Sequence, residues 1–459
     1  MAVKSVLGRA ARRFGRDRRG NYGMMMAVLA PMLLLGAGFG INIAQLSTAR
    51  SNLLAALDSA VTSTARDITT GVIKEEDART NLEAFLFANG ERSFSKLDKL
   101  KLDSVVLDRH RKTVEAKASV TVSVAFPLFG AANVQTITTE SAARYSDRQI
   151  EVAMVLDVTG SMKNSKITNL KTAAKSAVEV LLSGNKHSAD RVRIAIVPYA
   201  EAVNVGAKLV TSAVFYETKT GPWLPPPGWS PPASRKDNCA TERRATDGSP
   251  DFSDDAPSAL RTNDEGQQYR ARINRDWRIG SCPSASLIPL SSNKSQIDKA
   301  IDGFKANGWT GGGIAAQWGY YMLSPKWRDT ISGAGLGSGP ADYDPEKIGK
   351  IAILMTDGEF NTAFAGVPLE EKPQSEQTAL ASANAKSLCE AMKKDGIEIF
   401  TIGFALPKNE EDTAWDVLRN CASPDTHLTK HFYSAATGDD LKKAFLEIAR
   451  NIEQLALTK

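Results

Sequence analysis

The chain lacks the short motifs by which several classes of enzyme are identified from sequence. Its 459 residues contain no Gly-x-x-x-x-Gly-Lys-Ser/Thr loop, no His-Glu-x-x-His and no Gly-x-Ser-x-Gly. These are the signatures of P-loop NTPases, zinc proteases and α/β-hydrolases. We therefore expect a protein that is not an enzyme.

Cysteine and histidine are scarce, with four residues of each. No two cysteines have the Cys-x-x-Cys spacing that is common in zinc sites. His427 and His431 lie four positions apart, but no glutamate follows the first. We interpret both histidines as surface residues and not as metal ligands.

Charge is also lacking over one long stretch, since no charged residue occurs from Tyr22 to Leu46. An apolar run of about 20 residues can cross a bilayer as a helix. Residues 1–20 carry seven basic side chains against one acid, Asp17. A basic arm of this kind could bind nucleic acid, but next to an apolar run it favours a cytoplasmic end, so we expect no nucleic-acid partner.

We predict a basic cytoplasmic segment over residues 1–20 and a transmembrane helix over residues 21–46, anchored in lipid, with the remainder exported. A cleaved signal peptide and a buried core helix are the alternatives. The run exceeds the apolar region of a signal peptide, and the sequence after it continues in a helical pattern without an Ala-x-Ala site. Gly36 and Gly40 form a Gly-x-x-x-Gly face that would permit a homo-oligomer.

Residues 47–147 are predicted to form a helical stalk and a small α+β module. Apolar residues recur at helical spacing from Ala44 to Ile68, and a second short helix is expected near Ala84–Phe87. Three segments then alternate apolar and polar residues as strands do: residues 104–107, 113–126 and 134–145.

The amino-terminal layout resembles a known family. The basic stretch Phe14-Gly-Arg-Asp-Arg-Arg-Gly-Asn21 before a long apolar helix is similar to the TadE/TadG-like group of Tad/Flp pilus-assembly proteins. The resemblance implies a pilin-like membrane helix, stalk and exported body in a bacterial inner membrane, crossing it once with most of the chain in the periplasm. Cleavage after Gly20 would place Met25 at the fifth mature position, where prepilin peptidase substrates usually carry glutamate.

From residue 148 to residue 459 apolar runs alternate with helical patterns, which indicates an α/β domain with a parallel sheet. Insertions are expected near residues 215–287 and 325–347. The first contains Trp223-Leu-Pro-Pro-Pro-Gly-Trp229, for which extended backbone is expected, and its length indicates a functional or disordered loop; the second is rich in Gly and Ser and is predicted to be flexible. The expected strands are residues 152–156, 192–199, 351–355 and 397–404, and the expected helices residues 167–182, 314–322, 379–393 and 440–455.

Export would allow disulfides to form. The pairs Cys239–Cys282 and Cys389–Cys421 join nearest neighbours in the sequence. They are the simplest of the three connectivities open to four cysteines.

Oxygen-bearing side chains follow two of the predicted strands. Asp157, Thr159 and Ser161 come directly after the first, and Asp357 follows the strand at residues 351–355. A glycine-rich loop at residues 307–313 presents Thr310. The carboxyl ends of parallel strands meet at one edge of a sheet, and oxygen ligands suit a hard cation. The alternative is that the first three residues only cap the following helix. Glu359 is a candidate outer acid or a plain exposed residue.

Together these residues resemble the metal-ion-dependent adhesion site of the von Willebrand factor type A domain. The resemblance implies a Rossmann-like fold in which Thr159 and Ser161 are the two hydroxyl ligands, Thr310 is the threonine ligand, and Asp157 and Asp357 are the two acids. It also implies a divalent cation, Mg²⁺ before Ca²⁺ or Mn²⁺, whose shell an acidic group of a protein partner completes.

The two resemblances together predict a membrane-anchored protein that binds other pilus-assembly components through a metal ion. One alternative is a surface adhesin for host or matrix contact. Another is a metal-dependent hydrolase, since two acids and Mg²⁺ can activate water.

Overall fold

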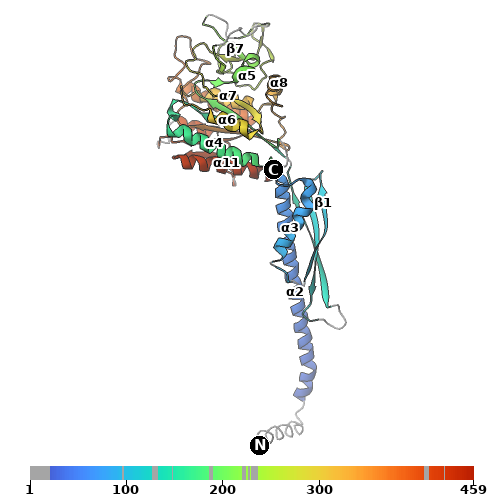
Figure 1. Cartoon of the computed structure of the whole chain (residues 1–459). Coiled ribbons are helices and arrows are strands. Elements are labelled where there is room, and N and C mark those ends of the chain that lie inside the picture. Colours follow the sequence, from blue (N-terminus) through green and yellow to red (C-terminus); the bar gives the residue numbers. More distant parts are fainter. Residues whose placement is uncertain are drawn as a thin grey trace. The chain divides into compact units, whose positions relative to one another are not determined.

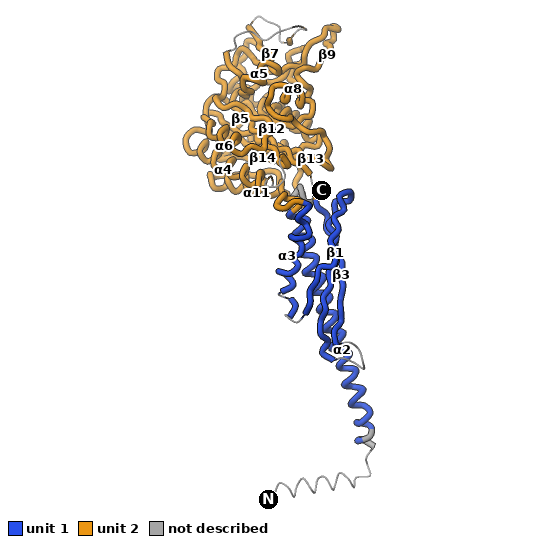
Figure 2. The backbone as a smooth tube through the Cα atoms, turned by 45° about the vertical axis from the view of Figure 1, so that its right-hand side comes forward, with its two compact units in different colours: residues 1–67, 75–145 blue, residues 68–74, 146–459 orange. Residues whose placement is uncertain are grey.

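The computed structural model describes residues 21–91, 93–95, 98–126, 133–146, 148–183, 185, 190–219, 224–225, 228, 236–407, 413–427 and 429–458. The basic segment at residues 1–20 and most of the Pro/Trp-rich stretch at residues 223–232 lie outside these residues. The chain divides into two compact units: unit 1 holds residues 1–67 and 75–145, and unit 2 holds residues 68–74 and 146–459 (Figure 2).

One long helix runs through unit 1. Helix α2 (Asn21–Thr69) has 49 residues and continues through Pro31. It is long and apolar enough to cross a membrane, with a mean hydropathy of 1.9 over its most apolar window. Met32, Leu33 and Leu34 are 66%, 69% and 72% exposed, so this part of the helix is not a buried core helix. A membrane span and a signal sequence both have this property.

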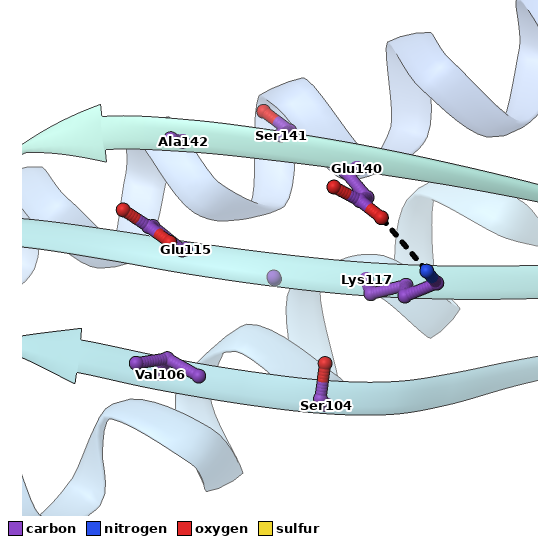
Figure 3. Close-up of a pocket in the computed structure, with 8 residues that line it drawn as sticks. Ser104, Val106, Glu115, Lys117, Glu140, Ser141 and Ala142 are labelled. Carbon is purple, nitrogen blue, oxygen red and sulfur yellow. Dashed lines mark hydrogen bonds and ion pairs between the residues drawn. The ribbon is translucent and has the colours of Figure 1, made fainter.

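The rest of unit 1 is the predicted α+β module. Helix α3 (Ala78–Gly90) is preceded by the turn η1 (Glu75–Asp77) and contains Ala84–Phe87, where a helix was predicted. Strands β1 (Lys99–Asp108), β2 (Thr113–Ser123) and β3 (Val134–Arg144) form an antiparallel sheet in the order β1-β2-β3. Alternate residues of β2 are buried, from Val114 to Val122. On the opposite face Lys117 pairs with Glu140 at 2.7 Å (Figure 3).

Unit 2 is built on the predicted parallel sheet. Its strands follow the order β15-β14-β13-β4-β5-β6-β8, in which β6 (Val203–Asn204) and β8 (Cys239–Ala240) are short antiparallel strands. The parallel ones are β4 (Gln149–Asp157), β5 (Val192–Tyr199), β13 (Ile348–Thr356), β14 (Glu398–Phe404) and β15 (Phe432–Ala435). The four predicted strands are confirmed. Strand β15, with four residues, was not predicted, and neither was the antiparallel β12 (Ile288–Ser291) beside β5.

Helices cover both faces of this sheet, because alternate residues of each buried strand point to opposite sides. Val152 and Met154 pack on one side and Ala153 and Val155 on the other. Figure 1 shows α4 and α11 side by side. The first layer consists of α4 (Ser165–Ser183), α6 (Lys294–Asp302) and α11 (Gly438–Thr458), and the second includes α7 (Gly312–Tyr321), α9 (Thr378–Lys394) and α10 (Thr413–Cys421). The α/β fold class is thus confirmed.

The described part of the first insertion is folded and not disordered, while the extended backbone was predicted for the Pro/Trp-rich stretch, most of which lies outside the described residues. Arg244 is buried in it between Glu217, at 3.2 Å, and Asp276, and its guanidinium also donates to the carbonyl of Phe364. These polar contacts add to the apolar residues that the insertion contributes to the core, among them Phe215, Ile273 and Ile279. The elements there are β7 (Val214–Tyr216), β8 (Cys239–Ala240), β9 (Leu260–Thr262), β10 (Gln268–Arg270) and β11 (Ile273–Arg275), and β6 (Val203–Asn204) and α5 (Gly206–Ala213) precede them.

The second insertion differs from the flexible segment that was predicted. It begins with the turn η3 (Pro325–Trp327) and helix α8 (Arg328–Gly333). The amide of Ala341 donates to the buried carboxylate of Glu151 at 2.8 Å, and the carbonyl of Ala341 accepts from Lys350 Nζ at 2.7 Å. Its Gly and Ser residues therefore form a loop fastened to the sheet.

Both predicted disulfides are confirmed. Cys239–Cys282 closes a loop within the first insertion, and Cys389–Cys421 joins α9 to α10.

Candidate metal centre

The two predicted acids lie at the carboxyl ends of neighbouring strands. Strands β4 and β13 are parallel and paired, with Leu156 opposite Met355, so Asp157 and Asp357 leave the sheet at the same edge. Ser161 Oγ donates to Asp357 Oδ1 at 2.5 Å, and Thr159 Oγ1 lies 2.9 Å from Ser161 Oγ. The structure thus brings four of the five predicted residues together.

Backbone and side-chain bonds hold Asp157 and its loop in place. Its Oδ1 accepts from the amide of Thr159 at 2.8 Å, and its Oδ2 accepts from Thr356 Oγ1 at 2.8 Å. The amide of Gly160 donates to the carbonyl of Gly308 at 2.9 Å, which ties this loop to the loop of Thr310.

The alternative of simple helix capping does not describe this loop. Thr159 precedes the short turn η2 (Gly160–Met162) but makes no side-chain cap bond there. Its hydroxyl faces Ser161 instead. The hydroxyls of Thr159 and Ser161 are thus directed toward each other, and that of Ser161 also toward Asp357.

The fifth predicted residue, Thr310, lines a cleft that it shares with two of the other four. Its amide donates to Asn361 Oδ1 at 3.0 Å, and its carbonyl accepts from the amide of Asn361 at 3.0 Å. Gly308 has a φ of +82°, a conformation that favours glycine. Thr310 lines a cleft of about 740 Å³ together with Thr159 and Ser161.

The electrostatics of the site fit a cation. Asp157 is fully buried, and this burial raises its pKa to about 6, with a further contribution from the negative charge of Asp357. Lys166 Nζ pairs with one of these acids, 2.7 Å from Asp357 Oδ2. One lysine beside two buried acids leaves an excess of negative charge, which is costly in the interior. Because the donors are all oxygens, the site suits a hard divalent ion.

One buried acid of this edge was missed in the sequence. Glu201 follows β5 by two positions and is 1% exposed. It lines the same cleft, accepts a hydrogen bond from the amide of Ser281, and has its pKa raised to about 7 by burial. The rule that selected Asp157 and Asp357, an acid just beyond a parallel strand, would have selected it too.

The remaining candidates make other contacts or are exposed. Glu359 is exposed and accepts a hydrogen bond from Thr413 Oγ1 at 2.8 Å. His427 is exposed as predicted, but the prediction for His431 was wrong. His431 is 1% exposed, stacks on Phe400 at 4.7 Å between ring centres, and lies 2.8 Å from Glu398 Oε1.

Comparisons with known proteins found no matching family model and no matching curated protein. Among solved structures, the von Willebrand factor domain of the type V pili tip protein Mfa5 from Porphyromonas gingivalis is 12% identical, covers 68% of this chain and 97% of its own, and gives a TM-score of 0.38. The pilus adhesin SpaC from Lactobacillus rhamnosus GG is 12% identical with a TM-score of 0.35; the match covers 78% of this chain, which spans 35% of SpaC. Proximal thread matrix protein 1 from the mussel byssus, with a zinc-occupied MIDAS motif, is 15% identical over 67% of this chain and 46% of its own, with a TM-score of 0.31.

Proposed function

We propose that this chain is a membrane-anchored protein that binds a protein partner through a divalent metal ion, as a component of a bacterial Tad/Flp-type pilus assembly or secretion system. The observation that carries the metal is the meeting of two buried carboxylates and two hydroxyls at the edge of β4 and β13. The amino-terminal resemblance supports the pilus system.

In this proposal each residue of the site has a distinct part. The hydroxyls of Thr159, Ser161 and Thr310 are metal ligands, and Asp157 and Asp357 supply negative charge directly or through water. Thr356 holds Asp157 in position through its hydroxyl. The bound ion would act as a positive charge with an open position for an acidic side chain of the partner. We take Mg²⁺ as the ion, with Ca²⁺ and Mn²⁺ as alternatives.

The membrane anchor is the apolar part of α2. Its exposed leucines and methionines would lie in lipid, and the two disulfides suit an oxidising compartment beyond the membrane. We therefore place unit 2 in the periplasm. Alkaline phosphatase fused after Lys459 should be active, whereas activity of a cytoplasmic reporter alone at that position would refute this topology.

The metal site is tested with the full chain in detergent. Isothermal titration calorimetry with Mg²⁺ should show one site in the wild type and none in Asp157→Ala, while the control Asp264→Ala, at an exposed turn, should bind as the wild type does. Pili should be lost in the Asp157→Ala strain. Unchanged metal binding in Asp157→Ala would refute the proposed site.

Two other functions predict different results. A surface adhesin would be found at the outer surface on fractionation, whereas an assembly component would stay in the inner membrane. A hydrolase would need a base, and Glu201 is a buried acid that lines the cleft. We propose binding without catalysis, so turnover of p-nitrophenyl phosphate with Mg²⁺ that disappears in Glu201→Gln would contradict it.

A further inference from the structure

The cleft beside the candidate metal centre extends well beyond the predicted ligands. Thr159, Ser161 and Thr310 form one part of its wall. The remainder comes from segments that are far apart in the sequence, including Lys163, Glu201, Trp309, Lys372 and Gln374. A volume of about 740 Å³ is large enough for several side chains of a partner.

Trp309 is the exposed aromatic side chain of this cleft. It directly precedes Thr310 and is 45% exposed. Lys372 Nζ lies over its ring, 5.5 Å from the centre. Tryptophan contributes more binding energy than most residues at protein interfaces, particularly next to a charged or polar rim. Because Trp309 is adjacent to Thr310, a ligand of the proposed metal, a partner bound at the metal would contact the Trp309 ring.

The available charges of the cleft are mainly positive. Lys163 is exposed, and the side chain of Lys372 is 52% exposed. Lys372 Nζ lies 3.9 Å from Glu376 Oε1, but both side chains of this pair are more than half exposed, so the pair is weak and Lys372 can still bind another carboxylate. The charge of Arg278 is already satisfied, since its side chain is 6% exposed and lies 2.8 Å from Asp276. Glu201 is the acid of the lining, and it is buried beneath the amide of Ser281. An anionic partner is therefore favoured over a cationic one.

We propose that this cleft binds an acidic protein segment through two points in addition to the metal: Trp309 contacts an apolar side chain, and Lys163 with Lys372 bind a second carboxylate. The first carboxylate of the segment reaches the metal, so this inference rests on the proposed function. The cleft then gives the site its preference for partners with two acids separated by an apolar residue.

Synthetic peptides test the preference directly. Fluorescein-labelled peptides carry Asp, then Leu, then Glu at one to four positions beyond the Leu, and each has a counterpart with Gln in place of the Glu. Binding to the full chain in detergent with Mg²⁺ is measured by fluorescence anisotropy. At least one two-acid peptide should bind the wild type about threefold to tenfold more tightly than its counterpart, and this preference should vanish at about 1 M salt.

Substitutions in the cleft test which residues cause the peptide binding and the preference for a second acid. Trp309→Ala should weaken binding by about tenfold or more, and Trp309→Phe should weaken it less. The double variant Lys163→Gln with Lys372→Gln should reduce the preference for the second acid to below about twofold. The controls are Leu260→Ala, an exposed apolar residue on β9, and Lys394→Gln, at the end of α9 that leads to the opposite edge of the sheet.

The outcomes separate this inference from the proposed function. If no two-acid peptide exceeds its counterpart, or if the cleft variants bind as the wild type does while Asp157→Ala fails to bind, the cleft inference is wrong and the metal site stands. If calorimetry detects no Mg²⁺ binding by the wild type, the proposed function fails. Equal binding with chelator present would also overturn the inference, because the first carboxylate would then have no metal to reach.

Discussion

Removing the hydroxyl of Thr356 tests whether its hydrogen bond positions Asp157 for metal binding. Thr356 is the last residue of β13, is fully buried, and donates to Asp157 Oδ2 at 2.8 Å. The same hydroxyl lies 3.0 Å from the carbonyl of Gly358. Because it has one proton, it can serve one acceptor at a time, and a carboxylate is the stronger acceptor. Thr356→Val therefore leaves Asp157 without this donor.

The size of the effect follows from the charge of the acceptor. Hydrogen bonds to charged groups contribute about 1.5–3 kcal/mol to stability. Loss of a residue that positions a metal ligand weakens metal binding by about 10–100-fold, which corresponds to a similar free energy. We expect Thr356→Val to bind Mg²⁺ about 10–100-fold more weakly and to unfold at lower denaturant concentration.

A matched variant separates the site from general stability. Thr401 lies on the neighbouring β14, is equally buried, and donates to the carbonyl of Leu418 at 2.9 Å. Thr401→Val should lose about 0.5–1.5 kcal/mol of stability and keep its affinity for Mg²⁺. Calorimetry and denaturant unfolding measure the two quantities. The reasoning is refuted if Thr356→Val binds Mg²⁺ within about twofold of the wild type, or if Thr401→Val loses as much affinity.

Three further predictions concern charge, pH and the disulfides. Lys166→Gln should bind Mg²⁺ several-fold more tightly by calorimetry, because it removes a cation beside Asp357; weaker binding would show that Lys166 supports the metal. Burial raises the pKa of Glu217 and Glu242 to about 7, so the folded chain keeps protons that the unfolded chain releases, and the free energy of unfolding should fall as pH rises through 7. Denaturant unfolding from about pH 5.5 to about pH 8.5 should show this fall, and Glu242→Gln should make it smaller; a rise would contradict the assignment. Removing Cys389–Cys421 with two alanines should cost about 3–4 kcal/mol in the same assay, since it closes a loop of 32 residues, and no loss would show that the bond does not constrain the unfolded chain.

The prediction of the sheet and of four site residues rested on local pattern. Apolar runs such as Val152–Leu156 can be buried on both faces only in a central parallel strand, so their ends had to meet at one edge. Asp157 and Asp357 follow two such runs directly, and their proximity came from strand pairing alone. The apolar part of helix α2 was equally predictable from sequence, because the uncharged run from Tyr22 to Leu46 is recognised without any tertiary contact.

Other features depended on contacts between distant segments. In the first insertion Arg244 is buried between two acids, whereas charged residues in a sequence are usually interpreted as surface residues. The pairing of Lys166 with Asp357 spans 191 positions, and no local pattern encodes it.

The amino-acid sequence by itself determined which oxygen atoms could form a metal site, because strand ends and their polar residues are adjacent in the chain. The tertiary structure alone decided what surrounds them: it placed Glu201, Trp309 and Lys372 in one cleft with Thr310. The physical reason is that the cleft is made by loops packed across the edge of the sheet, and such packing depends on shape and charge at long range.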